Sequence, residues 1–235
     1  MLFNWLRERR RRAILAEPFP DAWQAAIQRN VRLYSMLPAE EHADVRNYVH
    51  DFTAEKNWEG CGGLEMTDEI RATISAHVAI LTLGFDEQYF SRVLSILVYP
   101  TSYIAPRVPF VREGLVLERD DAREGEAWYR GPVILSWADV LTDGRGERPG
   151  RNLVLHEFAH QLDMLNGASD GIPAIETNAE LQRWKKVVGS SYRRLVRDCE
   201  AGRRPVLNCY GATSRTEFFA VATEAFFELP MELRA

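Results

Sequence analysis

Hydrophobic residues along most of the chain recur at helical spacing. Three stretches place apolar side chains three and four positions apart, and these predict helices at residues 20–34, 38–52 and 67–83. Three shorter runs are rich in aliphatic residues and bounded by proline or glycine, so they predict strands at residues 93–99, 115–117 and 133–137. The glycine-rich residues 56–63 predict a turn. Together these elements indicate an α+β protein that is mainly helical with a small sheet.

Residues 153–165 are apolar almost all round, which predicts a helix buried in the core. The stretch contains His156, Glu157 and His160 in the spacing H-E-x-x-H. Residues four apart lie one turn above each other, so both imidazoles can reach one metal ion. Glu157 is rotated by about 100° from His156 and is placed to take a proton from a water at the metal. The alternative is a core helix whose histidines only form hydrogen bonds, but the motif favours a zinc-dependent peptidase.

A catalytic zinc needs a third protein ligand, and residues 217–227 predict a buried helix that offers two. Glu217 and Glu224 lie seven positions apart and share one helix face. One carboxylate would bind the metal while the other accepts a hydrogen bond from a ligand imidazole, and the spacing does not choose between them. Asp163, one turn after His160, is a second candidate for such an outer hydrogen bond, or it serves only helix and loop contacts.

Tyr210 lies seven residues before Glu217, on residues that predict a loop leading into the same helix. Its hydroxyl could stabilise an oxyanion, an interaction typically worth a few kcal/mol in a water-excluded site. The alternative is a tyrosine that only packs against its neighbours. The adjoining Cys209 offers a thiolate as a weaker alternative to the glutamates as third ligand.

These motifs resemble the Mlc titration factor A family of bacterial cytoplasmic zinc metallopeptidases, which are of the gluzincin type and distantly related to lethal-factor-like toxins. The resemblance covers the second half of the chain: residues 131–137, 152–167, 210–213 and 217–227. It implies one Zn²⁺ per chain, bound by His156, His160 and Glu217. It further implies Glu157 as the general base and Tyr210 as the tyrosine on the oxyanion side.

The resemblance also implies a zincin-like fold with a small mixed sheet whose edge strand flanks the zinc helix. That strand would bind the extended backbone of a peptide or protein substrate. The residues expected to do so are Val133, Ile134, Leu135, Ser136 and Trp137. An aminopeptidase-like activity fits this expectation.

A second role follows from the same resemblance, namely sequestering a transcriptional repressor of sugar uptake, an Mlc-like partner, with or without proteolysis. The intact Glu157 favours catalysis, because a pure binding protein has no need of a water-activating carboxylate. The family is expected to continue for about one more helix beyond residue 235, so the chain is expected to be truncated at its C-terminus.

Composition narrows the remaining choices. A net charge of −5 and a pI of 5.6 argue against direct nucleic-acid binding by the whole protein. The exception is residues 1–16, a basic tail or helix that carries Arg7 and Arg9 to Arg12, whose apolar part is too short to span a membrane. Residues 17–235 are expected to form a single zincin-like domain.

Three cysteines without C-x-x-C spacing suggest no disulfide framework, and a reducing, cytoplasmic location is expected.

Overall fold

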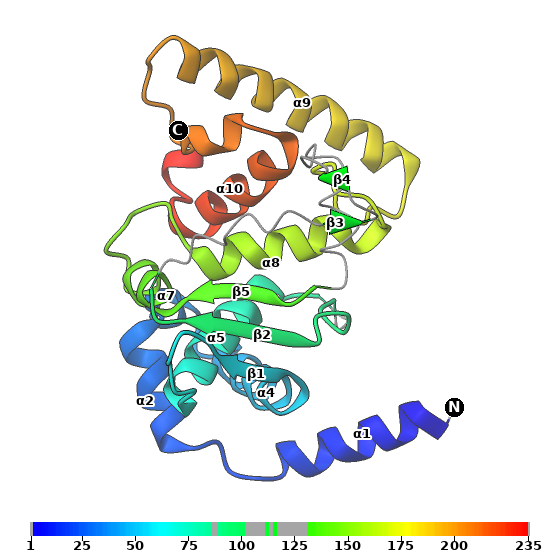
Figure 1. Cartoon of the computed structure of the whole chain (residues 1–235), viewed down its shortest axis with the longest axis vertical. Coiled ribbons are helices and arrows are strands. Elements are labelled where there is room, and N and C mark those ends of the chain that lie inside the picture. The colour runs from blue at the N-terminus through cyan, green and yellow to red at the C-terminus, as the bar shows by residue number, and fades with distance from the viewer. Residues whose placement is uncertain (1, 86–88, 102–110, 113–114, 117–130, 235) are drawn as a thin grey trace.

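The computed structural model describes residues 2–85, 89–101, 111–112, 115–116 and 131–234 (Figure 1). The first helices are α1 (Leu2–Leu15), α2 (Asp21–Asn30), α3 (Arg32–Met36), α4 (Glu41–Glu55) and α5 (Asp68–Leu81). The later helices are α7 (Trp137–Gly144), α8 (Leu153–Asp163), α9 (Asn178–Glu200) and α10 (Arg215–Glu228). Short 3-10 turns are η2 (Met164–Asn166), η3 (Cys209–Ala212) and η4 (Glu232–Arg234). The fold is mainly helical, as the pattern of apolar residues predicts.

The strands β1 (Asn57–Gly60), β2 (Ser95–Tyr99) and β5 (Val133–Ser136) form one sheet in the order β1-β2-β5. In the register, Ile96 lies beside Val133 and Val98 beside Leu135, and all four side chains are buried. Both pairings described in this sheet are parallel, whereas the family resemblance implies a mixed sheet. Parallel neighbours need a crossover, and α5 provides it between β1 and β2.

A separate antiparallel pair joins β3 (Val111–Arg112) to β4 (Leu115–Val116). It confirms a strand at residues 115–116, whereas residue 117 of the predicted strand lies outside the described residues.

The arrangement of layers places α8 next to the sheet edge. In Figure 1, α8 runs alongside β5, α5 packs behind the sheet, and α10 and α9 lie beyond α8. The expectation that an edge strand flanks the H-E-x-x-H helix is therefore confirmed for the described sheet.

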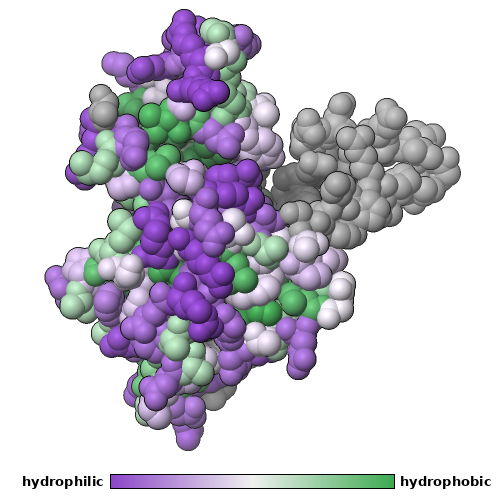
Figure 2. Space-filling view, turned by 90° about the vertical axis from the view of Figure 1, so that its left-hand side faces the viewer, coloured by the Kyte–Doolittle hydropathy of each residue, from purple (hydrophilic) through white to green (hydrophobic). Residues whose placement is uncertain are grey.

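Aromatic packing anchors α8 in the core. The Phe158 side chain is fully buried, and its ring centroid lies 6.0 Å from that of Phe52 and 4.8 Å from that of Phe90, both in edge-to-face geometry. Such pairs add to the area that the rings remove from water. Polar residues cover most of the coloured surface in Figure 2, and hydrophobic residues form one group in its upper part and another at its lower right.

Three local predictions are corrected by backbone geometry. The helix predicted at 20–34 is two helices that meet at Val31, whose φ of −122° and ψ of 86° are not helical. Part of the turn predicted at 56–63 is β1, because Asn57 N donates to Leu94 O at 3.0 Å and Cys61 N to Val98 O at 2.8 Å. The strand predicted at 133–137 ends one residue early, where Trp137 begins α7.

The arginine-rich N-terminus forms α1, which extends from the body of the protein in Figure 1. Two of its arginines contact α4: Arg10 Nη2 donates to Ala54 O at 3.0 Å, and Arg11 Nε lies 3.3 Å from an Asp51 oxygen. None of the described helices is both long enough and apolar enough to cross a membrane.

Cys199 and Cys209 form a disulfide between the last turn of α9 and the start of η3. This finding corrects the expectation of no disulfide. It also removes the cysteine pattern as a reason to expect a reducing compartment, because a disulfide persists best under oxidising conditions.

Candidate metal centre

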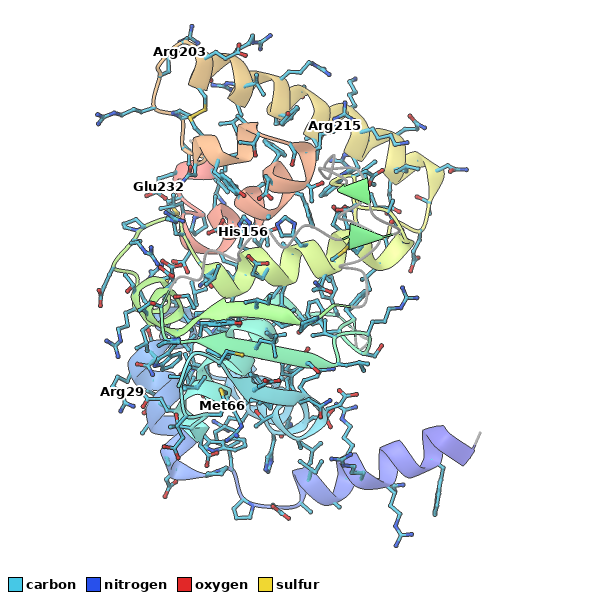
Figure 3. The ribbon with its side chains drawn as sticks, viewed as in Figure 1. Arg29, Met66, His156, Arg203, Arg215 and Glu232 are labelled. Atoms are coloured by element: carbon cyan, nitrogen blue, oxygen red, sulfur yellow. A yellow bond between two sulfur atoms is a disulfide. The ribbon has the colours of Figure 1, made fainter. Side chains whose placement is uncertain are left out.

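The start of α8 is set by Asn152. Its Oδ1 accepts a hydrogen bond from Leu155 N at 3.2 Å, the pattern of a helix N-cap. The helix then buries one face in the core, and His156 lies between α8 and α10 in Figure 3. His160 follows one turn later on the same side, since its Nε2 is 3.2 Å from His156 Nε2.

The third group comes from α10. Ser214 Oγ caps this helix by accepting from Glu217 N at 3.1 Å, which fixes Glu217 in the first turn. Glu217 Oε2 lies 3.1 Å from His156 Nε2 and 3.6 Å from His160 Nε2. Within the described part of the chain, these three residues are the group that could hold a metal ion. The structure thus brings Glu217, rather than Glu224, to the two Nε2 atoms.

The spacing of these three atoms fits zinc. Ligand bonds of about 2.0–2.1 Å in a tetrahedron put neighbouring ligand atoms ~3.3 Å apart, and the observed separations are 3.1, 3.2 and 3.6 Å. The donor set favours a cation for a second reason. An ionised carboxylate only accepts hydrogen bonds, so His156 Nδ1 donates to Glu224 Oε1 at 2.8 Å. In neutral His156 the Nε2 lone pair then faces the Glu217 oxygen, and the two repel unless a cation lies between them.

The pKa shifts in the metal-free site also indicate that positive charge is favoured between the carboxylates. Burial lowers the pKa of His156, but hydrogen bonds to Glu217 and Glu224 outweigh it and raise that pKa to about 10. For Glu217, burial raises the pKa, yet the neighbouring imidazoles of His156 and His160 outweigh it and lower the value to about 2. Without a metal, a proton on His156 supplies the positive charge that the two carboxylates need.

Glu224 is the second carboxylate of α10, after Glu217, that contacts His156 of α8. Its Oε1 receives His156 Nδ1, and its Oε2 accepts from Asn152 N at 2.6 Å. The carboxylate is buried, so both bonds lie out of solvent. This is the outer hydrogen bond that the sequence could not assign between the two glutamates, and such bonds orient a ligand imidazole.

The hydrogen-bonded chain continues through residues that the sequence reading missed. Asn152 Nδ2 donates to Glu228 Oε1 at 3.0 Å, and Arg32 from α3 pairs with the other oxygen of this buried carboxylate. Asn152 Nδ2 also lies 3.2 Å from His77 Nδ1. Two sequence signals could have found these groups: an asparagine immediately before an apolar helix, and a carboxylate one turn after Glu224.

Glu157 lines a cavity of about 350 Å³ that reaches His156, one of the three candidate ligands. Burial raises its pKa, although the charges of His156 and His160 work in the opposite direction. The cavity is also lined by His156, Tyr210 and Glu224. A carboxylate facing an open volume next to a candidate metal position has room for a water molecule and for part of a substrate.

Tyr210 lies on η3, where Asn208 Oδ1 accepts from Tyr210 N at 2.9 Å. Its ring centroid is 6.0 Å from that of His156, and 53% of the residue is exposed. Burial, followed by the charge of Glu217, raises the pKa of the phenol, which keeps it protonated and able to donate a hydrogen bond. The structure therefore brings Tyr210 to the site. Cys209, the alternative third ligand, is in the disulfide.

Two other groups of predicted site residues do not meet the candidate ligands. Asp163 Oδ2 accepts from Gly171 N at 3.0 Å and stabilises the loop after α8, while its Oδ1 has no hydrogen-bond partner among the described residues. Residues 133–136 lie at the edge of the described sheet and Trp137 begins α7, and none of these five residues lines the cavity beside Glu157.

The fold and this His–Glu–His–Glu arrangement define the class of zincin-like metallopeptidases. The comparison of sequences gives the family. The model of the glucose-regulated metallo-peptidase M90 family matches residues 5–235, so the chain belongs to that family.

Sequence similarity to known relatives extends over most of the chain. An uncharacterised protein of Synechocystis sp. is 34% identical over 98% of this chain and 84% of its own length. A protein named Mlc titration factor A from Serratia proteamaculans is 29% identical over 88% of this chain and 79% of its own. A protein of the same name from Cronobacter sakazakii is 27% identical over 97% of this chain and 84% of its own.

Proposed function

We propose that this protein is a zinc-dependent peptidase whose metal is held by His156 Nε2, His160 Nε2 and Glu217 Oε2. The convergence of these three atoms, each within 3.6 Å of the others, is the observation that carries the proposal. Three protein ligands leave the fourth position of a tetrahedral ion open for chemistry. Membership of a metallopeptidase family supports the same conclusion.

Zinc, when bound, polarises a peptide carbonyl and lowers the pKa of a water molecule toward 7. Glu157 takes the proton from the attacking water and passes it to the leaving amine. The pKa of Glu157, raised by burial, suits a group that must both accept and release a proton near neutral pH. The phenol of Tyr210 donates a hydrogen bond to the oxygen on which negative charge develops.

The substrate in this proposal is a peptide or protein segment that adds in extended conformation to β5, which lies at the edge of the sheet formed by the described strands. Residues 133–136 would supply main-chain hydrogen bonds, and α8 alongside them would present the reacting groups. An aminopeptidase-like activity and a cytoplasmic location belong to the same proposal.

The first test is the metal content of the purified protein by elemental analysis. We expect about one zinc per chain, with most of it lost in His156→Ala and in Glu217→Ala. The exposed Glu176→Ala provides the matched control and is expected to keep its zinc. Equal zinc in all four proteins would contradict this ligand set.

A second variant separates metal binding from catalysis. Glu157→Gln keeps the shape of the side chain but removes its basicity, so it is expected to retain zinc and lose peptide hydrolysis. Full peptidase activity in this variant would exclude Glu157 as the base.

The second candidate function is binding of an Mlc-like repressor of sugar uptake, with or without proteolysis. The name of two relatives, Mlc titration factor A, favours it. The same Glu157→Gln variant tests it, because sequestration without proteolysis survives loss of the base. A pull-down of purified repressor by the variant and by the wild type would compare the two directly.

A further inference from the structure

The cavity beside Glu157 has two arginines in its lining, and their environments differ. Arg148 donates from Nε to Asp143 at 2.7 Å and from Nη2 to Asp139 at 2.6 Å. Its guanidinium is thereby paired with two carboxylates of the protein. Arg151 also lines the cavity, is exposed, and forms no hydrogen bond or ion pair through its side chain within the described part of the chain.

Two carboxylates of the same lining, Asp143 and Glu224, do not need Arg151 as a hydrogen-bond donor. Asp143 receives Arg148 Nε on one oxygen and Leu153 N, at 3.1 Å, on the other. Glu224 receives one donor on each of its oxygens, as described above. Arg151 contributes only a through-space attraction to Asp143. Its guanidinium is therefore a charged fork of donors that faces the cavity without a hydrogen-bonded partner among these residues.

The backbone that carries Arg151 is held in place. Arg151 N donates to Arg148 O at 3.2 Å, and the next residue, Asn152, is the N-cap of α8. Gly150 has a φ of +75°, and a Cβ there would come within 2.6 Å of Leu229 Cδ1, so a larger residue would disturb this turn. The side chain thus starts from a fixed point at the cavity wall, only five positions before His156.

We propose that Arg151 binds a carboxylate of the substrate and makes the protein selective for peptides that carry one close to the scissile bond. The proposal rests on the proposed peptidase function, because Glu157, the proposed general base, lines the same cavity as Arg151. A guanidinium pairs with a carboxylate through two parallel hydrogen bonds, a geometry that a neutral amide does not reproduce. Two sources share this chemistry: an acidic side chain and the terminal carboxylate of a short peptide.

Binding can be measured without turnover, in zinc-loaded protein that carries Glu157→Gln. The probes are short peptides of one sequence with an amidated end, in which glutamate or glutamine occupies each position in turn. A further glutamine peptide keeps its free terminal carboxylate. Calorimetry gives the affinity of each, and hydrogen bonds to a charged group correspond to roughly a tenfold or larger preference.

Arg151→Gln in the same background is expected to remove that preference and to bind the neutral peptide with unchanged affinity. Arg151→Lys keeps the positive charge but cannot form the two parallel hydrogen bonds, and it is expected to retain part of the preference for the charged peptide. Arg194→Gln, on the exposed face of α9, is the control and is expected to bind as the parent does. A preference for the glutamate peptides identifies a side chain as the source, and one for the free terminus identifies the chain end.

Three outcomes would overturn the proposal: equal affinity for charged and neutral peptides, a preference that persists in Arg151→Gln, or no binding of any peptide. Failure of the proposed hydrolysis looks different. In that case the wild type cleaves none of these peptides, while the variant still discriminates between them through Arg151.

Discussion

Replacement of Glu224 by glutamine tests how the ligand helix is held. The two carboxylate oxygens accept one donor each, His156 Nδ1 at 2.8 Å and Asn152 N at 2.6 Å. An amide has only one accepting oxygen, so in Glu224→Gln its NH₂ group must face one of these two donors. A buried donor without a partner costs about 1–3 kcal/mol.

The loss is expected to appear in metal affinity if the amide oxygen pairs with Asn152 N. His156 then has no acceptor for Nδ1, and removal of such an outer partner typically weakens metal binding roughly ten- to a hundredfold. If the oxygen pairs with His156 instead, the unpaired group is the N–H at the start of α8. The cost then falls on the free energy of unfolding of the metal-free protein.

Both quantities are measurable on the same preparations. Competition with a chromophoric chelator gives the zinc affinity, and urea unfolding of the metal-free protein gives the stability. Glu232→Gln, an exposed residue of η4, is the matched control. If Glu224→Gln equals the wild type in both measurements, the hydrogen bonds of Glu224 do not position the metal ligand.

Three further predictions concern the framework of the site. Phe158→Ala empties a fully buried position between two other rings and is expected to lower the free energy of unfolding by about 3–5 kcal/mol, measured in urea; a loss below about 1 kcal/mol would contradict the packing. His77 is buried, and burial lowers its pKa from 6.5 to about 4, so the unfolded chain takes up this proton at higher pH than the folded chain. As the pH is lowered from 6.5 to 4, the free energy of unfolding is then expected to fall by about 1.4 kcal/mol per pH unit. His77→Gln is expected to remove this contribution to the pH dependence. Reduction of the Cys199–Cys209 disulfide is expected to cost roughly 2–3 kcal/mol in urea unfolding, with Cys199→Ser/Cys209→Ser as the control that reductant leaves unchanged.

Local patterns predicted the parts of the site that lie on one element. The spacing of His156 and His160 and the apolar residues around them are properties of a single helix, so they could be interpreted without the fold. Glu217 and Glu224 share a face of α10, and only the way this helix packs on α8 decides which of them reaches the imidazoles. The resemblance to a family chose Glu217 before the geometry did.

The misses have a common physical cause, since each depends on contacts between distant residues. The four residues of β1 contain no β-branched side chain, and their extended form comes from pairing with β2. The disulfide needs the end of α9 next to η3, which no cysteine spacing expresses. Arg32 and Glu228 are 196 positions apart, so their pairing could not be read from sequence periodicity.

The positions of the candidate ligands and of the disulfide along the chain lead to a topological consequence. A metal held by His160 and Glu217 would close the chain between them into a ring, and the Cys199–Cys209 bond closes a smaller ring inside it. A single proteolytic cut between residues 201 and 208 would open both rings, but the metal and the disulfide would still hold the two fragments together. Chelation alone or reduction alone would leave one link intact, and only the two together would remove every link between the fragments except their packing.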